Sequence, residues 1–133
     1  MDHWVAGRLI DWAAGSNEST KAILMRDLSE HADELAGPDP SPVERALADV
    51  AATSWFALRL HESHYIAAVR SEDGMTLAQS EHAQRRIDRA HRRFLSTIKT
   101  LATVRRLALP AVQVNIANRQ QIAQIAGTPH EAV

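Results

Sequence analysis

The chain has 133 residues, of which 45% are hydrophobic and 5% aromatic, and its 15 Lys and Arg against 16 Asp and Glu give a net charge of −1. Because it contains no cysteine, a disulfide framework, a thiolate nucleophile, a zinc finger and an iron–sulfur cluster are excluded. The apolar content is too high for a wholly disordered chain, and the length suits one domain with a modest core.

Neither a secretory leader nor a membrane span is expected. Gly7, Arg8 and Asp11 interrupt the first apolar stretch, and no basic segment precedes it. No window approaches the ~18 apolar residues needed to cross a bilayer. We therefore expect a cytoplasmic protein without a membrane partner.

Two helices are predicted in an N-terminal pair, residues 1–36. Apolar residues at three-to-four spacing place the first at about 2–14. The second begins near Ser19, taken as its N-cap, and stops at Gly37-Pro38. A Pro-rich linker over residues 37–41 follows, because proline disfavours helix at itself and at the preceding residue.

A long helical hairpin is predicted over residues 42–109. Ser41-Pro42-Val43-Glu44 has the pattern of a capping box with proline at the first helical position. The helix that it starts runs to about Arg70, and a turn leads to a second helix that Pro110 is expected to end. Two long helices joined by a short turn fold back as an antiparallel pair.

A heptad repeat on the last helix predicts self-association. Ile87, Phe94, Leu101 and Ala108 recur every seven residues, with small or branched residues three positions after them. The preceding helix is apolar on more than one face and so needs more than one partner. The predicted interface of a homo-oligomer comprises Trp55, Ile87, Phe94, Leu101, Val112, Val114 and Ile116.

The last segment, residues 110–133, has two interpretations that the sequence leaves open. Val112, Val114 and Ile116 alternate with polar residues, a strand-like period that would need other chains for ordering. The alternative is a frayed, Gln/Asn-rich tail. The expected fold class is therefore all-α, a helical bundle built on a long antiparallel helical hairpin with a short strand-like or disordered C-terminal tail.

Charge is distributed unevenly along the chain. Residues 1–76 hold six basic and thirteen acidic side chains, a balance of −7, and residues 77–133 hold nine basic and three acidic, a balance of +6. Arg85, Arg89 and Arg92 form one stripe on the face away from the heptad seam, flanked by Arg86 and Arg93. Such a stripe can follow the phosphates of nucleic acid.

The candidate nucleic-acid-binding residues, for DNA or RNA, are Arg85, Arg86, Arg89, Arg92, Arg93, Arg105 and Arg106. Two structural roles are favoured over nucleic-acid binding for the stripe, because it could pair with the acidic helices or form the solvated flank of a coiled coil. No aromatic residue is interleaved with the arginines, so the sequence gives little support for stacking of single-stranded bases.

The sequence predicts no enzyme, cofactor or metal site. Asp88 and His91 have the i, i+3 spacing of carboxylate–imidazole metal sites, but they adjoin the arginine stripe outside the seam, and a metal protein is only a third hypothesis. Ser63 and His64 are adjacent on a helix and point apart, so they cannot form a catalytic dyad. Trp4, Trp12 and Trp55 are expected to anchor a core or an interface.

Several segments carry a family resemblance. They are Ser41-Pro42-Val43-Glu44-Arg45, Ala90-His91-Arg92-Arg93-Phe94-Leu95, and Leu101-Ala102-Thr103-Val104-Arg105-Arg106 with the tail Val112-Gln113-Val114-Asn115-Ile116-Ala117. They resemble a group of uncharacterised bacterial proteins over residues 38–126. That group has no assigned activity, so the resemblance implies no catalytic residues.

The predicted architecture is also similar to the oligomeric core of phage terminase small subunits. In that family hairpins form a ring, tail strands form a shared barrel, and a separate N-terminal helix-turn-helix binds DNA. Residues 1–36 depart from this pattern, because they have an acidic surface and no evident recognition helix. We therefore expect a self-associating interaction or assembly protein, with nucleic-acid binding as the alternative and a further protein partner left open.

Overall fold

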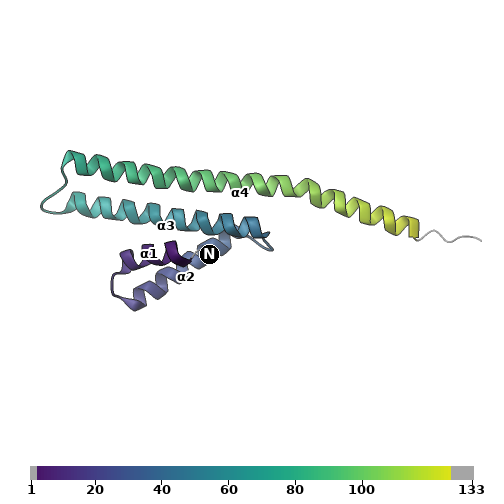
Figure 1. Ribbon diagram of the computed structural model, residues 1–133, viewed down its shortest axis with the longest axis horizontal. Helices are drawn as coiled ribbons and strands as arrows, with labels where there is room; N and C mark the ends of the chain where they lie inside the picture. The colour runs from purple at the N-terminus through teal and green to yellow at the C-terminus, as the bar shows by residue number, and fades with distance from the viewer. Residues whose placement is uncertain (1–2, 127–133) are drawn as a thin grey trace, which may run out of the picture. The chain divides into compact units, whose positions relative to one another are not determined.

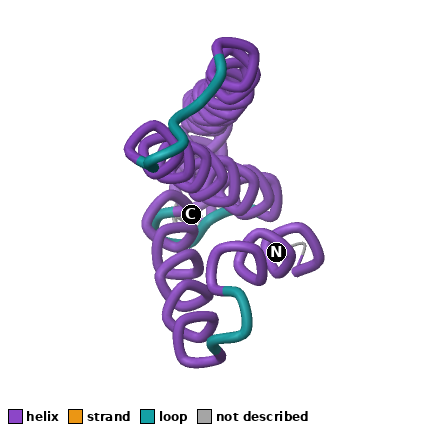
Figure 2. The backbone as a smooth tube through the Cα atoms, turned by 90° about the vertical axis from the view of Figure 1, so that its left-hand side faces the viewer, coloured by secondary structure: helices purple, strands orange, loops and turns teal. Residues whose placement is uncertain are grey.

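The protein is all-α, as the sequence predicts (Figure 1). The computed structural model describes residues 3–126 of the chain, with side chains described for residues 5–108 and for Arg119. Short loops join the helices, and the described residues contain no strand (Figure 2). The four helices are α1 (His3–Ala14), α2 (Glu18–Ala36), α3 (Pro42–Arg70) and α4 (Leu77–Ala126).

Two compact units divide the chain within α4, at Met1–Leu101 and Ala102–Val133. The first unit contains α1, α2, α3 and the beginning of α4. The predicted linker at residues 37–41 is therefore a turn inside this unit, where Gly37 adopts a φ of 72° and donates its N–H to the carbonyl of Asp33 at 3.0 Å. A residue with positive φ after a helix is favoured as glycine because no Cβ opposes it.

The start of α2 differs from the prediction. Its N-cap is Asn17, whose side-chain Oδ1 accepts a hydrogen bond from the Thr20 N–H at 3.0 Å. Ser19 lies inside the first turn instead. Asparagine and serine are comparable N-caps, and the turn after α1 leaves Asn17 in the extended conformation that a cap requires.

Both long helices begin with a capping box. In α3 the Ser41 N–H donates to Glu44 Oε2 at 2.8 Å, and the Glu44 N–H donates to Ser41 Oγ at 3.3 Å, as the sequence predicts. Thr76 and Gln79 make the same reciprocal pair before α4, at 3.0 and 3.2 Å. Each box satisfies two backbone donors that the first helical turn leaves unpaired.

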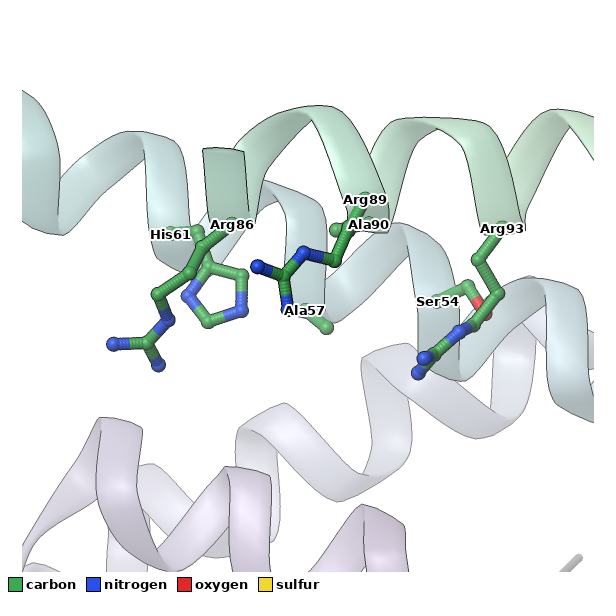
Figure 3. A pocket seen from close by; sticks show the side chains of 7 residues that line it. All are labelled: Ser54, Ala57, His61, Arg86, Arg89, Ala90 and Arg93. Carbon is green, nitrogen blue, oxygen red and sulfur yellow. The ribbon is translucent and has the colours of Figure 1, made fainter. Parts of the chain in front are cut away.

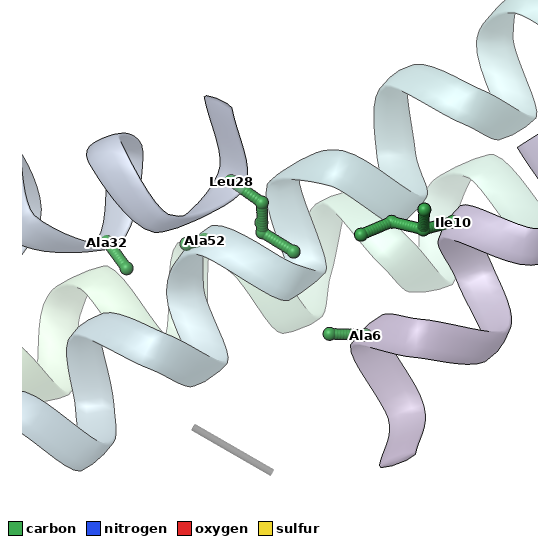
Figure 4. Close-up of a cluster of buried hydrophobic side chains, with 5 residues drawn as sticks. All are labelled: Ala6, Ile10, Leu28, Ala32 and Ala52. Atoms are coloured by element: carbon green, nitrogen blue, oxygen red, sulfur yellow. The ribbon is translucent and has the colours of Figure 1, made fainter. Parts of the chain in front are cut away.

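The hydrophobic core lies where α1 and α2 pack on α3 (Figure 4). Ile10 and Leu28 are its largest fully buried side chains. They pack with the small residues Ala6, Ala32 and Ala52, and alanines allow helix backbones to approach closely. Half-buried Leu24, Met25, Leu35 and Phe56 surround this cluster.

α3 and the part of α4 that belongs to the first unit form the predicted antiparallel hairpin (Figure 1). Side chains connect the two helices near the turn: the Tyr65 hydroxyl lies 3.2 Å from Ser80 Oγ and accepts a hydrogen bond from Gln84 Nε2 at 3.1 Å. α3 thus packs against the N-terminal helices on one face and faces α4 with another.

Two predictions about the end of the chain are wrong for the described residues. Pro110 does not end the last helix, and residues 110–126 are helical rather than strand-like or disordered. Pro110 removes only one hydrogen bond, the one that its N–H would donate to Arg106, and the long flanking helix tolerates this loss. The alternation at Val112, Val114 and Ile116 covers five residues, too few to outweigh the helix formers Ala, Gln and Arg that follow. Residues 127–133 of the predicted tail lie outside the described residues.

Among the described residues, no helix combines the length and the apolar character that crossing a membrane would require.

The core makes a direct prediction about stability. Leu28→Ala should lower the free energy of unfolding by about 2 to 5 kcal/mol, because it leaves a cavity in the cluster. Ile23→Ala on the same helix is the control, since Ile23 is half exposed and should cost at most about 1 kcal/mol. Chemical denaturation measures both; equal losses would contradict this description of the core.

The cap of α2 gives a second prediction. Asn17→Ala should destabilise the protein by about 1 kcal/mol, because the Thr20 N–H loses its acceptor. Ser19→Ala should cost nothing, because alanine favours the helix interior more than serine does. Thermal unfolding compares the two variants, and a larger effect at Ser19 would restore that residue as the cap.

Candidate functional site

The heptad seam of α4 is its least exposed face. Thr97 and Leu101 are buried, Ile87 and Phe94 are half-buried, and the arginines between them are exposed. The seam positions of the first unit therefore face α3, as expected when a helix presents its apolar stripe to a neighbour. The remaining seam residues with described side chains are Ala83, Ala90 and Val104, which are half-buried, and Ala108, which is exposed.

A groove lined by three arginines runs between α3 and α4 (Figure 3). Arg86, Arg89 and Arg93 come from α4 and meet the side of α3 that carries Ser54 and His61. We call this hollow of about 180 Å³ the arginine groove; it is lined by Ser54, Ala57, His61, Arg86, Arg89, Ala90 and Arg93.

The groove changes the predicted grouping of the arginines. The sequence places Arg89 with Arg85 and Arg92 on the face away from the seam, whereas the structure places it beside Arg86 and Arg93. Long side chains that flank an apolar seam reach around it with their aliphatic stems. Arg85 and Arg92 do not line the groove, and Arg105 and Arg106 belong to the second unit.

The arginines of the groove have no carboxylate partner among the residues that the structure describes. Arg86, Arg89 and Arg93 make no ion pair there, while the neighbouring Arg85 is within 3.4 Å of Glu81 on its own helix. For these three side chains, the described residues thus give no support to the alternative in which acidic helices pair with the stripe. Six acidic residues of the first three helices pair with basic residues of those helices, in Lys21–Asp11, Lys21–Glu18, Arg26–Asp27, Arg26–Glu30, Arg45–Asp33 and Arg59–Glu62.

An aromatic pocket of about 250 Å³ adjoins the groove, and the two share His61 and Arg86. Trp12 of α1 stacks on His64 of α3, with ring centroids 4.3 Å apart and planes inclined by 11°. The Trp12 and His61 rings are 5.9 Å apart and tilted. The pocket is lined by Trp12, His61, His64, Tyr65, Ala68, Met75, Ala83 and Arg86.

Of the two roles expected for Trp12, anchoring the core does not apply, because 47% of the residue is exposed; anchoring an interface stays a prediction. Trp55 contacts another helix of the first unit: its ring centroid lies 4.4 Å from that of His31 on α2. The side chains of Trp4, Val112, Val114 and Ile116 lie outside the described ones.

A third hollow, of about 550 Å³, continues from the aromatic pocket toward the turn between α3 and α4. It shares Arg86 with both other hollows and has His82 on its border. His82, Arg86, Arg89 and Arg93 follow an i, i+4, i+7, i+11 pattern along one flank of α4, and we call them the basic row. This helical spacing is visible in the sequence, but only the structure shows that it borders a groove.

Electrostatics in the groove disfavour further positive charge. Burial lowers the pKa of His61 below its ordinary value, and the charges of Arg86 and His64 lower it further. Hydrogen bonds with Ser80 and Gln84 lower the pKa of Tyr65 below its ordinary value. The positive charges of the groove thus favour the uncharged form of His61 over its protonated form.

The histidine and carboxylate clusters do not converge. Asp88 and His91 are both exposed, and among the described residues no three His, Asp or Glu side chains come together as a metal site would require. Ser63 Oγ donates to the Arg59 carbonyl at 2.9 Å, while His64 stacks on Trp12. Each is thus engaged away from the other.

Comparison of the chain with protein-family models, curated proteins and solved structures finds no match. The resemblances to uncharacterised bacterial proteins and to terminase small subunits stay predictions.

The electrostatic coupling in the groove is directly testable. Arg86→Gln should raise the pKa of His61 toward its ordinary value of 6.5, because a neighbouring positive charge is removed. Arg92→Gln removes the same charge outside the groove and should leave the pKa of His61 unchanged. NMR titration of the histidine ring protons measures both; equal shifts would contradict the predicted proximity of Arg86.

Proposed function

We propose that the protein is a non-enzymatic assembly protein that associates with further copies of itself through α4. The observation that carries this proposal is that the unit at the end of α4, Ala102–Val133, holds one helix only among its described residues. A lone helix is marginally stable in water and depends on packing of its apolar face.

The apolar pattern supports a second copy as the partner. The heptad seam passes from Leu101 through Val104 to Ala108, and Leu107 beside it is 68% exposed. Seams of this kind associate with identical seams in coiled coils. The structure describes the side chains of α4 over residues 77–108, and among these only Thr97 and Leu101 are buried. Most side chains of this part of the helix are therefore accessible to another copy.

The hydrogen bonds of the site support binding rather than catalysis. Ser63 and His64 do not interact as a catalytic pair: Ser63 Oγ donates to the Arg59 carbonyl, and the His64 ring stacks on Trp12. The exposed apolar side chains of α4 instead provide the contact area that helix association uses.

Leu107→Asp tests the proposal. The substitution would bury a charge in the interface between copies, so the mass measured by light scattering should fall to that of a single chain. The single chain should keep the helices of the unit Met1–Leu101, which does not contain Leu107, and lose helix only at the end of α4, which then lacks a partner. Phe94→Asp is a less selective test, since half-buried Phe94 also faces α3.

Leu77→Asp is the matched control. Leu77 is 77% exposed at the start of the same helix, where an acidic residue is favourable, so the mass should stay that of the wild type. A wild-type protein that is monomeric at high micromolar concentration would refute self-association. Two variants with unchanged mass would refute this interface.

A further inference from the structure

We infer that the arginine groove and the aromatic pocket together bind single-stranded nucleic acid, with phosphates along the basic row and a base stacked at Trp12. All contributing residues lie in the unit Met1–Leu101. The site therefore does not depend on the self-association proposed above.

The phosphate side of the site follows from unpaired charge. Arg86, Arg89 and Arg93 make no ion pair with a carboxylate among the described residues, whereas Asp11, Asp33 and Glu62 pair with Lys21, Arg45 and Arg59. The planar guanidinium group matches the oxygens of a phosphate with two parallel hydrogen bonds. At ~1.5 Å per residue the basic row extends for about 16 Å, enough for a short run of nucleotides.

The base side of the site follows from the exposed indole. Trp12 is held by the His64 ring at 4.3 Å, yet 47% of the residue remains exposed. It therefore offers an ordered aromatic surface at the border of a hollow that contains Arg86. Proteins that bind single strands combine such stacking surfaces with a positively charged groove.

The shape of the groove favours a strand over a compact ligand. The arginine groove and the aromatic pocket, at about 180 and 250 Å³, are each smaller than the ~300 Å³ at which enclosed ligand sites begin. They share Arg86 with the third, larger hollow of about 550 Å³, so the three hollows follow one another along α4. A duplex would present phosphates but no free base face, and an acidic peptide would leave the Trp12 surface unused.

The test is fluorescence anisotropy with a labelled single-stranded oligonucleotide of about 16 nucleotides at low salt. Arg86→Gln/Arg89→Gln/Arg93→Gln should weaken binding at least tenfold. It should also reduce the slope of log affinity against log salt by about 2, since each phosphate contact with a single strand contributes about 0.7. Arg85→Gln/Arg92→Gln/Arg106→Gln removes equal charge outside the groove and should weaken binding by less than threefold.

Trp12→Ala tests the base contact and should weaken binding by about tenfold, with thermal unfolding as the check that the variant is folded. Should Trp12→Ala unfold the protein, Trp12→Phe replaces it, with a smaller loss of affinity expected. The Leu107→Asp variant should still bind, which separates this site from self-association.

Several results would overturn the inference. They are no binding of the single strand at low salt, equal losses in the two triple variants, and unchanged affinity in a folded Trp12 variant. Tighter binding of a duplex of the same length, or equal binding of poly-glutamate, would assign the groove to another partner. A mononucleotide that competes as strongly as the strand would make the ligand a free nucleotide instead.

Discussion

The packing of α3 against two sets of neighbours is the constraint on which the rest of the structure depends. Ala48, Ala51 and Ala52 are fully buried on α3, and these small side chains let α1 and α2 approach closely. The same helix carries Ser54, His61 and Tyr65 toward α4. Because α1 is held against α3, Trp12 reaches His61 and His64, and the aromatic pocket forms next to the arginines.

Charge is balanced over the whole chain but not at each place within it. Acidic side chains of α1 and α2 form ion pairs with Lys21, Arg26 and Arg45. These pairs neutralise part of the negative charge of the two helices locally. The arginines of the groove keep their charge; burial lowers the pKa of His61 most, and the charge of Arg86 lowers it further. Exposed ion pairs contribute little stability; here they occupy the carboxylates of Asp11, Glu30 and Asp33.

Local signals predicted the helices well. The capping box at Ser41 is formed as expected, and the hairpin follows from two long helices with a short turn. The errors arose where local signals were weak or competed. Asn17 and Ser19 are both acceptable caps, and Pro110 usually ends a helix but lies here between strong helical segments. Only part of the candidate site could be predicted from the sequence. The arginines were predicted, but Trp12 was not, because α1 brings it to them from a distant part of the chain.

The sequence by itself determined the all-α fold, the missing thiol chemistry, the seam of α4 and the concentration of positive charge beside it. These properties depend on composition or on residues within about two helical turns of one another. Only the tertiary structure decided that Arg86, Arg89 and Arg93 share a groove, and that His61, Trp12 and the arginines meet. The reason is geometric: helical periodicity defines the faces of each helix, but which face meets which neighbour depends on how α1, α2 and α4 pack around α3.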